Sequence, residues 1–250
     1  MSPTNPIRVL NDAPLDGPIN MARDEALMTR IGRGRSPATL RLYQWDPPTI
    51  SLGYFQPYSD YEALPPPAGE LAIVRRLTGG GAILHDLELT YSLSLPVNHP
   101  LLGDGAGHLY EHAHDAVIAC LKELDIVSEY CGTTDDSGPA KGPFFCFERR
   151  HRYDVVLKSG KITGSAQRRT RDAILQHGSI ILGSRYDQQR VGRMSVPFDQ
   201  TIARLRTNFI EKLGALANVG FNDGEWTPEE LEAADDLIPK YAGDEWNKRT

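Results

Sequence analysis

Hydrophobic and polar residues alternate one by one over residues 90–96 (TYSLSLP). Because successive side chains of a β-strand point to opposite faces, this alternation predicts a strand with one apolar and one polar face. Other short runs, rich in β-branched and aromatic residues and bounded by Pro, Gly or Asp, predict further strands. These lie at 38–45, 49–55, 71–77, 82–85 and 173–182, and a hairpin is expected over 152–169 with its turn at Ser159-Gly160.

The hydrophobic period changes to that of a helix over residues 108–124. The apolar stripe of this helix consists of Leu109, Ala113, Ala116, Val117, Cys120, Leu121 and Leu124. Cys120 lies on the stripe, so we expect it to be a core residue. A second helix is expected over residues 19–28 with Asn20 as its N-cap, and the capping box of Thr227 and Glu230 predicts a third helix further on.

The order of these elements indicates the fold class. Strands occur in adjacent runs, with helices before, between and after them, and this differs from the regular alternation of a doubly wound sheet. We therefore predict an α+β fold with a largely antiparallel sheet and helices packed against it. No internal repeat and no shift in composition marks a linker, so residues 1–250 are expected to form a single domain.

Composition excludes several classes of protein. The net charge of −6 disfavours a general nucleic-acid binder, because neutralising phosphates needs clustered positive charge. No apolar run is long enough to span a bilayer, and the first residues lack the pattern of a secretory signal. The three cysteines form no C-x-x-C pair and have no zinc-type spacing. We expect reduced thiols in a cytoplasmic protein, no metal site, and no nucleic-acid or membrane partner.

Three consecutive glycines, Gly79 to Gly81, stand in the stretch RRLTGGGAILHD. A P-loop would continue with Lys-Ser or Lys-Thr, and a dinucleotide fingerprint would lead into a helix, whereas here a strand is expected to follow. The helix dipole that attracts phosphate is therefore missing. Two interpretations remain: a turn that needs positive φ angles, or a loop whose backbone N–H groups approach a ligand closely.

Cys146 and Lys161 are candidates for nucleophilic chemistry. Cys146 precedes the predicted hairpin in GPFFCFERRHRYDV, and Lys161 begins its second strand in GKITGSAQ. The register of the hairpin decides whether the two side chains meet. An ammonium beside a thiol favours the nucleophilic thiolate and can donate a hydrogen bond to a developing oxyanion. The alternatives are an apolar cysteine buried among phenylalanines and an exposed strand lysine.

Taken together, these segments resemble the biotin/lipoate protein ligase superfamily. They are most similar to its branch of lipoate–protein ligase A and the cysteine-dependent octanoyltransferases. The resemblance runs from about Ile19 to about Leu182 and rests on GPINMARDEALM, WDPPTISLGYFQ, RRLTGGGAILHDLELTYSLSLP and GKITGSAQRRTRDAILQHGSIIL, with YAGDEWNKR further on. It implies a mixed, mainly antiparallel sheet flanked by helices, like the catalytic domain of class II aminoacyl-tRNA synthetases. It also implies that the chain lacks the accessory C-terminal domain found in many of the ligases.

The resemblance implies the residues of the site as well. Cys146, in the pattern CF…Y-D-V, is similar to the nucleophile of the octanoyltransferases, and Lys161 is implied as its catalytic partner. In the family, the Arg-Arg-x-x-Gly-Gly-Gly loop encloses the carboxyl end of an octanoyl or lipoyl chain. We therefore expect the glycines to approach an acyl thioester, with no side chain to block the passage. The residues implied to bind substrate are Arg75, Arg76, Thr78, Gly79, Gly80, Gly81, His85, Gly164, Ser165, Ala166, His177 and Gly178.

Two points stay open at this stage. His85 and His177 are placed near the site by their motifs, and the alternative for each is a hydrogen-bonded structural histidine. Between the nucleophile and Tyr153 the family usually has Pro-Ser, whereas this chain has Arg150-His151. Basic islands at 148–152 and 167–171 in an acidic chain are expected to steer an acidic partner.

The resemblance implies an octanoyltransferase of lipoate biosynthesis. Such an enzyme moves an octanoyl group from acyl carrier protein, through a cysteine thioester, to a lysine of a lipoyl domain. The acceptors would be proteins such as the glycine cleavage H protein or the E2 subunits of 2-oxoacid dehydrogenases, and no cofactor is expected. Two alternatives remain: a lipoate–protein ligase that uses ATP and magnesium, and a non-catalytic acyl- or lipoyl-domain-binding protein.

Overall fold

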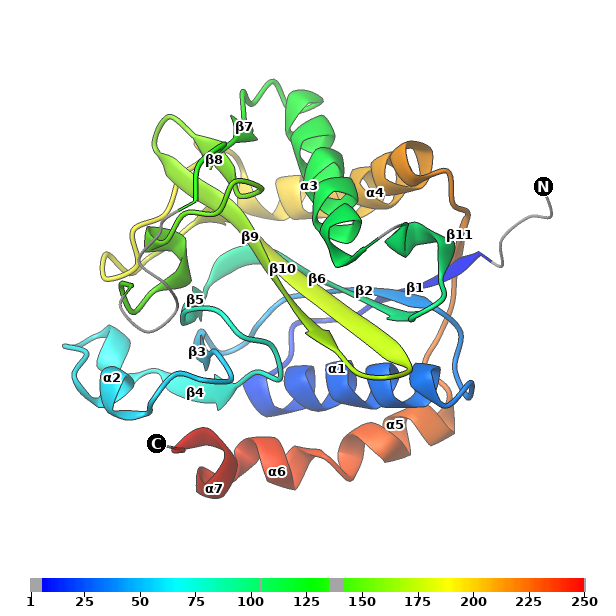
Figure 1. Ribbon diagram of the computed structural model, residues 1–250. Helices are drawn as coiled ribbons and strands as arrows, with labels where there is room; N and C mark the ends of the chain where they lie inside the picture. The colour runs from blue at the N-terminus through cyan, green and yellow to red at the C-terminus, as the bar shows by residue number, and fades with distance from the viewer. Residues whose placement is uncertain (1–5, 104, 135–141, 250) are drawn as a thin grey trace.

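A mixed sheet of eight strands forms the centre of the computed structural model, which describes residues 6–103, 105–134 and 142–249 (Figure 1). Its strands follow the order β11-β1-β2-β6-β10-β9-β8-β7. They are β1 (Ile7–Asn11), β2 (Thr39–Tyr43), β6 (Leu87–Pro96), β7 (Glu129–Tyr130), β8 (Val155–Leu157), β9 (Gly160–Arg169), β10 (Ala173–Gly183) and β11 (Phe221–Asp223). Strand β1 runs parallel to β2 and β11, and every other neighbouring pair is antiparallel. This confirms the predicted mixed, mainly antiparallel sheet.

A second, three-stranded sheet carries the glycine loop. Its order is β4-β3-β5, with β3 (Thr49–Leu52) between β4 (Ala72–Arg75) and β5 (Ile83–His85). Because β4 and β5 lie on opposite sides of β3, the loop between them crosses the end of β3 and is no hairpin turn. The crossing is close, since a Cβ on Gly53, just after β3, would lie 2.0 Å from the carbonyl oxygen of Gly80.

Helices cover both faces of the central sheet (Figure 1). Helices α3 (Ala106–Lys122) and α4 (Phe198–Ala217) pack on one face, and α1 (Gly17–Gly32) packs on the other, against α5 (Pro228–Asp235) and α6 (Ile238–Ala242). The shorter elements are α2 (Ser59–Glu62), α7 (Asp244–Asn247) and the 3₁₀ turns η1 (Ala68–Glu70), η2 (Pro100–Leu102) and η3 (Cys146–Glu148). Within the described residues, no helix has the length and apolar character needed to cross a membrane.

Strand β6 shows how the alternating pattern is used. Its apolar residues, among them Leu89 and Leu93, join the main core with residues of α3 and α4. Its polar residues are buried too, because the other face lies under α1 and the small sheet: Ser92 bonds Asp24 of α1, and Thr90 bonds the indole of Trp45. The polar face of the sheet therefore lines an interior, where the site forms, and does not face solvent. Cys120 is fully buried in the main core, as predicted.

Three sequence-based expectations about local structure were wrong. Residue Leu157 pairs with Gly160, so the hairpin turns at Lys158-Ser159 and not at Ser159-Gly160. Helix α1 begins earlier than expected, with Asp16 as N-cap, since the Asp16 carboxylate accepts a hydrogen bond from the Ile19 amide. Asn20 lies inside the helix and donates to the carbonyl of Leu15.

Other elements differ in extent from the prediction. Helix α4 was not expected, although its buried residues follow helical spacing; they include Ile202, Leu205, Phe209 and Leu213. The capping box of Thr227 and Glu230 is present, but the helix that it starts ends at Asp235, and α6 follows as a separate helix. Strand β1 was also not expected. Residues 135–141, within the polar stretch CGTTDDSGPAKG that starts at Cys131, lie outside the described residues.

Candidate active site

Two adjoining cavities meet at Cys146. An inner apolar cavity reaches between the two sheets, and an outer vestibule opens toward α3 and η3. Both are lined by Gly80, Cys146, Ser165 and Ala166. The inner cavity is also lined by the expected residues Arg76, His85, Gly164, His177 and Gly178, and the vestibule by Gly79, Gly81 and Lys161. A thiol at this junction is accessible from the vestibule and adjoins the apolar cavity.

The glycine loop lies directly against the cysteine. The Cys146 amide donates to the carbonyl of Ala82 at 2.7 Å, just after the loop. A Cβ on Gly81 would lie 2.9 Å from the backbone nitrogen of Cys146, so a larger residue would push the two segments apart. Gly80 has a φ of +92°, and a Cβ there would lie 3.9 Å from the Cys146 sulfur. The loop thus needs glycine both for its backbone conformation and for its close approach to Cys146.

Arg76 fixes the shape of the loop from inside. Its guanidinium donates to the carbonyls of Gly79 and Gly81, at 3.1 and 2.9 Å, and to the carbonyl of Ser51 at 2.6 Å. Burial lowers the pKa of Arg76 to about 10, which still leaves the group charged at neutral pH. Its charge-assisted hydrogen bonds fix the orientation of the loop carbonyls.

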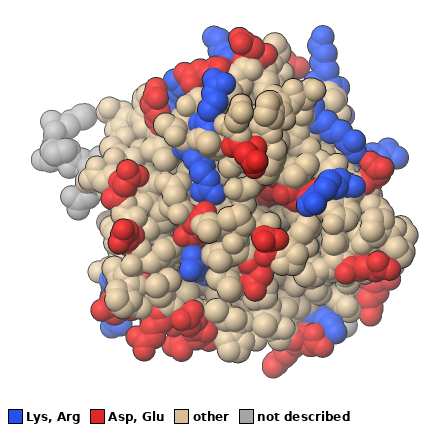
Figure 2. Space-filling view, turned by 180° about the vertical axis from the view of Figure 1, so that it is seen from behind, with Lys and Arg blue, Asp and Glu red and all other residues tan. Residues whose placement is uncertain are grey.

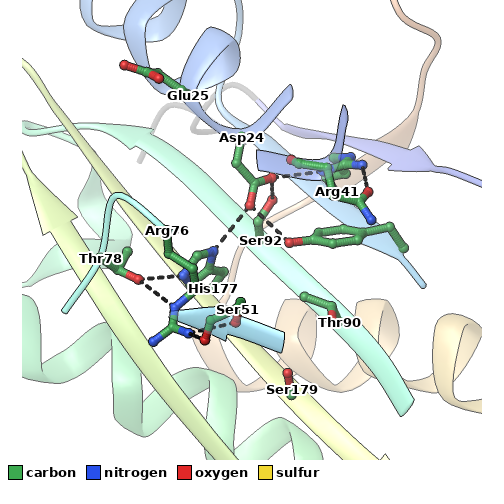
Figure 3. A network of polar contacts seen from close by, with 12 residues as sticks. Asp24, Glu25, Arg41, Ser51, Arg76, Thr78, Thr90, Ser92, His177 and Ser179 are labelled. Atoms are coloured by element: carbon green, nitrogen blue, oxygen red, sulfur yellow. Dashed lines mark hydrogen bonds and ion pairs between the residues drawn. The ribbon is translucent and has the colours of Figure 1, made fainter. Parts of the chain in front are cut away.

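A buried polar network extends from the loop toward α1 (Figure 3). His177 contacts the Thr78 hydroxyl through Nε2, at 2.6 Å, and the Asp24 carboxylate through Nδ1, at 3.2 Å. Because the carboxylate accepts, Nδ1 carries the proton and Nε2 accepts from Thr78. Burial lowers the pKa of His177, although Asp24 opposes this effect. Thr78 therefore fixes the orientation of the His177 ring through the hydrogen bond drawn in Figure 3.

His85 is held in the same manner. Its Nδ1 lies 2.8 Å from the Glu88 carboxylate, its Nε2 lies 2.7 Å from the Ser51 hydroxyl, and its ring stacks on Trp45 with centroids 3.8 Å apart. Burial lowers the pKa of His85 more than Glu88 raises it. Both histidines are thus hydrogen-bonded in the manner of structural residues, and both also line the inner cavity.

The Lys161 side chain contacts the backbone of the segment that contains Cys146. Its ammonium lies 2.7 Å from the Asp154 carboxylate and donates to the carbonyls of Cys146 and Arg149, at 3.2 and 3.4 Å. Burial disfavours the charge, but the Cys146 sulfur and Asp154 outweigh it, so the pKa of Lys161 is raised. Gly164 makes room for this side chain, because a Cβ there would lie 2.8 Å from Lys161 Cε. The register of the hairpin therefore does bring Lys161 and Cys146 together.

Arg75 has a different position from its neighbour Arg76. It is fully buried, and its guanidinium donates to backbone carbonyls that include those of Gly53 at 2.9 Å, Gln56 at 2.6 Å and Asn247 at 2.7 Å. Arg75 lines neither cavity within the described part of the chain. These contacts attach the segment around α7 to the small sheet. Arg75 thus stabilises the packing of the C-terminal segment, whereas Arg76 stabilises the glycine loop.

Residues that the sequence did not single out complete the site. Asp24 and Glu88 anchor the two histidines, Asp154 pairs with Lys161, and Tyr110 and His114 line the vestibule. A signal for His114 existed, since it directly follows Ala113 of the apolar stripe of α3 and is itself buried. Among the residues that the structure describes, no group of three or more His, Cys, Asp or Glu side chains is arranged to hold a metal ion.

Comparison with known proteins identifies the family of this chain. Residues 16–207 match the lipoyl protein ligase A/B catalytic domain, so the chain belongs to that family. It is 36% identical to the octanoyltransferase LipM of Kyrpidia tusciae, over 97% of this chain and 98% of that protein.

Solved structures share the fold. A putative lipoate protein ligase from Thermoplasma acidophilum superposes with a TM-score of 0.79 at 24% identity, over 97% of this chain and 98% of that one. A second structure, of a bi-partite lipoate protein ligase and its E2 lipoyl domain from the same organism, superposes with a TM-score of 0.70 at 22% identity, over 97% and 96% of the two chains. At these identities the likeness establishes the fold of the catalytic domain, as the resemblance implied.

Proposed function

We propose that the protein is an octanoyltransferase of lipoate biosynthesis, which carries the acyl group on Cys146. The observation that carries this proposal is the position of Cys146 at the junction of the two cavities, beside the buried ammonium of Lys161. The relative from Kyrpidia tusciae is an octanoyltransferase, and its similarity extends over nearly the whole chain. The inner cavity would receive the octanoyl tail, and the vestibule would receive the protein partners in turn.

The chemistry needs no nucleotide. Octanoate attached to acyl carrier protein is a thioester, so its carbonyl is already activated, and transfer to the Cys146 thiolate exchanges one thioester for another. An amine of a lipoyl-domain lysine then attacks, and the amide that forms is more stable than the thioester. We therefore propose that neither ATP nor magnesium takes part, and that Lys161 stabilises negative charge on the thiolate and on the carbonyl oxygen.

The partners follow from the two steps. The proposed donor is octanoyl-acyl carrier protein. The proposed acceptor is a lipoyl domain, as in the glycine cleavage H protein or an E2 subunit, and one ligase of the same fold is known together with its E2 lipoyl domain. Accepting an acidic protein at the vestibule fits the basic residues Arg149 and Arg150, which line it.

Intact mass spectrometry tests the proposal. The wild-type protein, mixed with octanoyl-acyl carrier protein without ATP, is expected to gain one octanoyl group. Cys146→Ala should gain none and transfer nothing to a lipoyl domain, while Cys120→Ala and Cys131→Ala should still acylate. Lipoylation by Cys146→Ala that depends on ATP would instead identify a lipoate–protein ligase, and binding without turnover by the wild type would identify a non-catalytic binding protein.

A further inference from the structure

A hydrogen-bonded chain of side chains ends beside the nucleophile, and the transfer described above gives it no role. Ser165 lines both cavities together with Cys146, and His114 lines the vestibule. The Ser165 hydroxyl lies 2.6 Å from His114 Nε2 and 2.6 Å from the Tyr91 hydroxyl. His114 and Tyr91 are buried, whereas Ser165 is only partly buried, at the cavity wall.

The backbone carbonyl of Leu109 fixes the direction of the hydrogen bonds that lead from Gln176 through Tyr91 to Ser165. Gln176 Nε2 lies 3.1 Å from the carbonyl of Leu109, which can only accept, so this atom is the amide nitrogen. Its second hydrogen goes to the Tyr91 hydroxyl at 3.0 Å. Tyr91 accepts there and therefore donates its own proton to Ser165. Burial raises the pKa of Tyr91 to about 12, so it keeps this proton at neutral pH.

A second carbonyl fixes the other end. His114 Nδ1 lies 2.5 Å from the carbonyl of Tyr153, so Nδ1 carries a hydrogen. Burial lowers the pKa of His114 to about 4, and the neutral ring has its lone pair on Nε2. Ser165 therefore donates to His114. With one proton given and one hydrogen bond accepted, the Ser165 oxygen keeps one lone pair for a donor in the cavity.

Gly178 keeps the serine in this position. A Cβ on Gly178 would lie 2.3 Å from Ser165 Oγ and 2.7 Å from a ring carbon of Tyr91. Only glycine on the neighbouring strand leaves space for the contact between Ser165 and Tyr91. Gly178 therefore permits the hydrogen bond between Tyr91 and Ser165, and it also lines the inner cavity.

We propose that Ser165 accepts a hydrogen bond from the amine of the acceptor lysine and orients its nitrogen toward the thioester on Cys146. His114 is a positioning residue, because its Nε2 accepts the hydrogen bond of the Ser165 hydroxyl and leaves the serine oxygen free to act as an acceptor. The inference rests on the acyl transfer proposed above and deepens it. Because the Ser165 hydroxyl already donates its hydrogen bond to His114, it cannot donate one to an oxyanion. Its oxygen can still accept a hydrogen bond from an N–H group, and only the second half-reaction brings an amine to the site.

The step balances without a further reactant. The acceptor ammonium first loses one proton to water, and the amine nitrogen, held by Ser165, attacks the thioester carbonyl carbon. A C–N bond forms, and the C–S bond breaks with its electron pair going to the Cys146 sulfur. The second nitrogen proton passes to that sulfur, which leaves an amide and a free thiol. Ser165 changes neither its bonds nor its charge.

The test measures the two half-reactions separately. Octanoyl-acyl carrier protein is used to form the acyl-enzyme, which intact mass spectrometry quantifies, and the isolated acyl-enzyme is then mixed with an E2 lipoyl domain in a single turnover. Ser165→Ala and His114→Leu are expected to slow the transfer to the lipoyl domain much more than they slow formation of the acyl-enzyme. Both should slow the transfer about 10- to 100-fold, as expected for one lost hydrogen bond to a charging nitrogen.

Two kinds of variant separate this role from a structural one. His114→Gln offers one donor to Tyr153 and one acceptor to Ser165, like the neutral histidine, so it should recover much of the transfer rate. The matched controls are Ser94→Ala, whose buried hydroxyl has no partner in the described residues, and His108→Leu on the exposed side of α3; both should transfer normally.

The possible outcomes are distinct. An equal loss in both half-reactions, or a folded His114→Gln that transfers as slowly as His114→Leu, would overturn the inference and leave the proposed transferase intact. A wild-type protein that forms no acyl-enzyme would contradict the proposed function and the inference with it.

Discussion

The ammonium of Lys161 donates to the backbone carbonyl of Cys146 at 3.2 Å, although the two residues belong to different elements. The β8–β9 hairpin brings Lys161 next to η3, and Asp154, just before β8, holds the ammonium at 2.7 Å. The segment from Asp154 to Lys161 therefore sets the position of the lysine and supplies the carboxylate that pairs with its charge. This arrangement places a charged ammonium beside Cys146, because the pKa of Lys161 is raised.

Replacing Lys161 is expected to stop transfer. Lys161→Arg keeps the charge but cannot reproduce the three contacts of a compact ammonium, so both this variant and Lys161→Met should lose activity by a factor on the order of 10²–10³, as for loss of an oxyanion donor. Lys161→Met leaves Asp154 unpaired, so the double variant with Asp154→Asn controls for instability. Lys158→Met, on the exposed turn, should be normal. Near-normal turnover by folded Lys161→Arg would rule out the geometric role.

Gly164 can be tested by adding one methyl group. In Gly164→Ala the new Cβ would lie 2.8 and 2.9 Å from Lys161 Cε and Nζ, and the flexible lysine would move aside. We expect a normal melting temperature with a marked loss of acyl-enzyme formation, measured by intact mass. Gly183→Ala on β10, where the new Cβ would lie 3.9 Å from Leu87 Cδ1, is the matched control. Wild-type acylation by Gly164→Ala would show that the lysine position is not critical.

Charge reversal tests where the acyl donor docks. Arg168 stacks over Tyr54 at 5.2 Å, and the neighbouring Phe55 is 82% exposed beside Gly79 at the vestibule. Seen from behind relative to Figure 1, the surface carries Lys and Arg as well as Asp and Glu side chains (Figure 2). Arg168→Glu should raise the KM for octanoyl-acyl carrier protein and flatten its salt dependence, with no change for octanoyl-coenzyme A, which has no carrier domain.

The control for docking is Arg204→Glu on α4. Arg149 is less suitable for charge reversal, because its Nε donates to the carbonyl of Pro143 at 2.8 Å and a change there would disturb the loop before Cys146. Equal KM values for the carrier substrate in Arg168→Glu and Arg204→Glu would place the docking surface elsewhere.

Acid should destabilise the fold through the buried pair of Arg41 and Asp12. Burial raises the pKa of Asp12, but Arg41 and Trp226 outweigh it, so the folded-state pKa lies below the usual 3.8. A carboxyl with a lowered pKa stabilises the folded state fully above its unfolded pKa, and this stabilisation is lost as the pH falls through the folded value. Asp12→Asn should lose about 3–5 kcal/mol at pH 7, as for a broken buried pair.

The measurement for this prediction is a series of thermal melts between neutral pH and pH 2. The wild-type protein and Asp12→Asn are expected to differ most at neutral pH and to converge below pH 4. A constant difference over the whole range would show that the carboxylate charge at residue 12 is not what stabilises the pair.

The short-range part of the fold was present in the sequence. Alternation over 90–96 defined the two faces of β6, and helical spacing defined α3, since each depends only on neighbours along the chain. The β8–β9 hairpin was also indicated, although its turn was placed one residue too late. The resemblance on the glycine and lysine segments indicated Cys146 and Lys161. The spacing of Ile202, Leu205, Phe209 and Leu213 was also sufficient to predict α4.

Long-range packing decided the rest. An alternating strand does not reveal that its polar face is buried, and only the packing of α1 and the small sheet on β6 turned Thr90 and Ser92 into parts of an interior network. Likewise, no local pattern distinguishes Arg75, which holds the C-terminal segment, from Arg76, which holds the glycine loop. The direction of the hydrogen bonds at Ser165 depends on the carbonyls of Leu109 and Tyr153. The position of each proton in these buried hydrogen bonds depends on all the partners together. Those partners are far apart in the sequence, and only the tertiary structure brings them into contact.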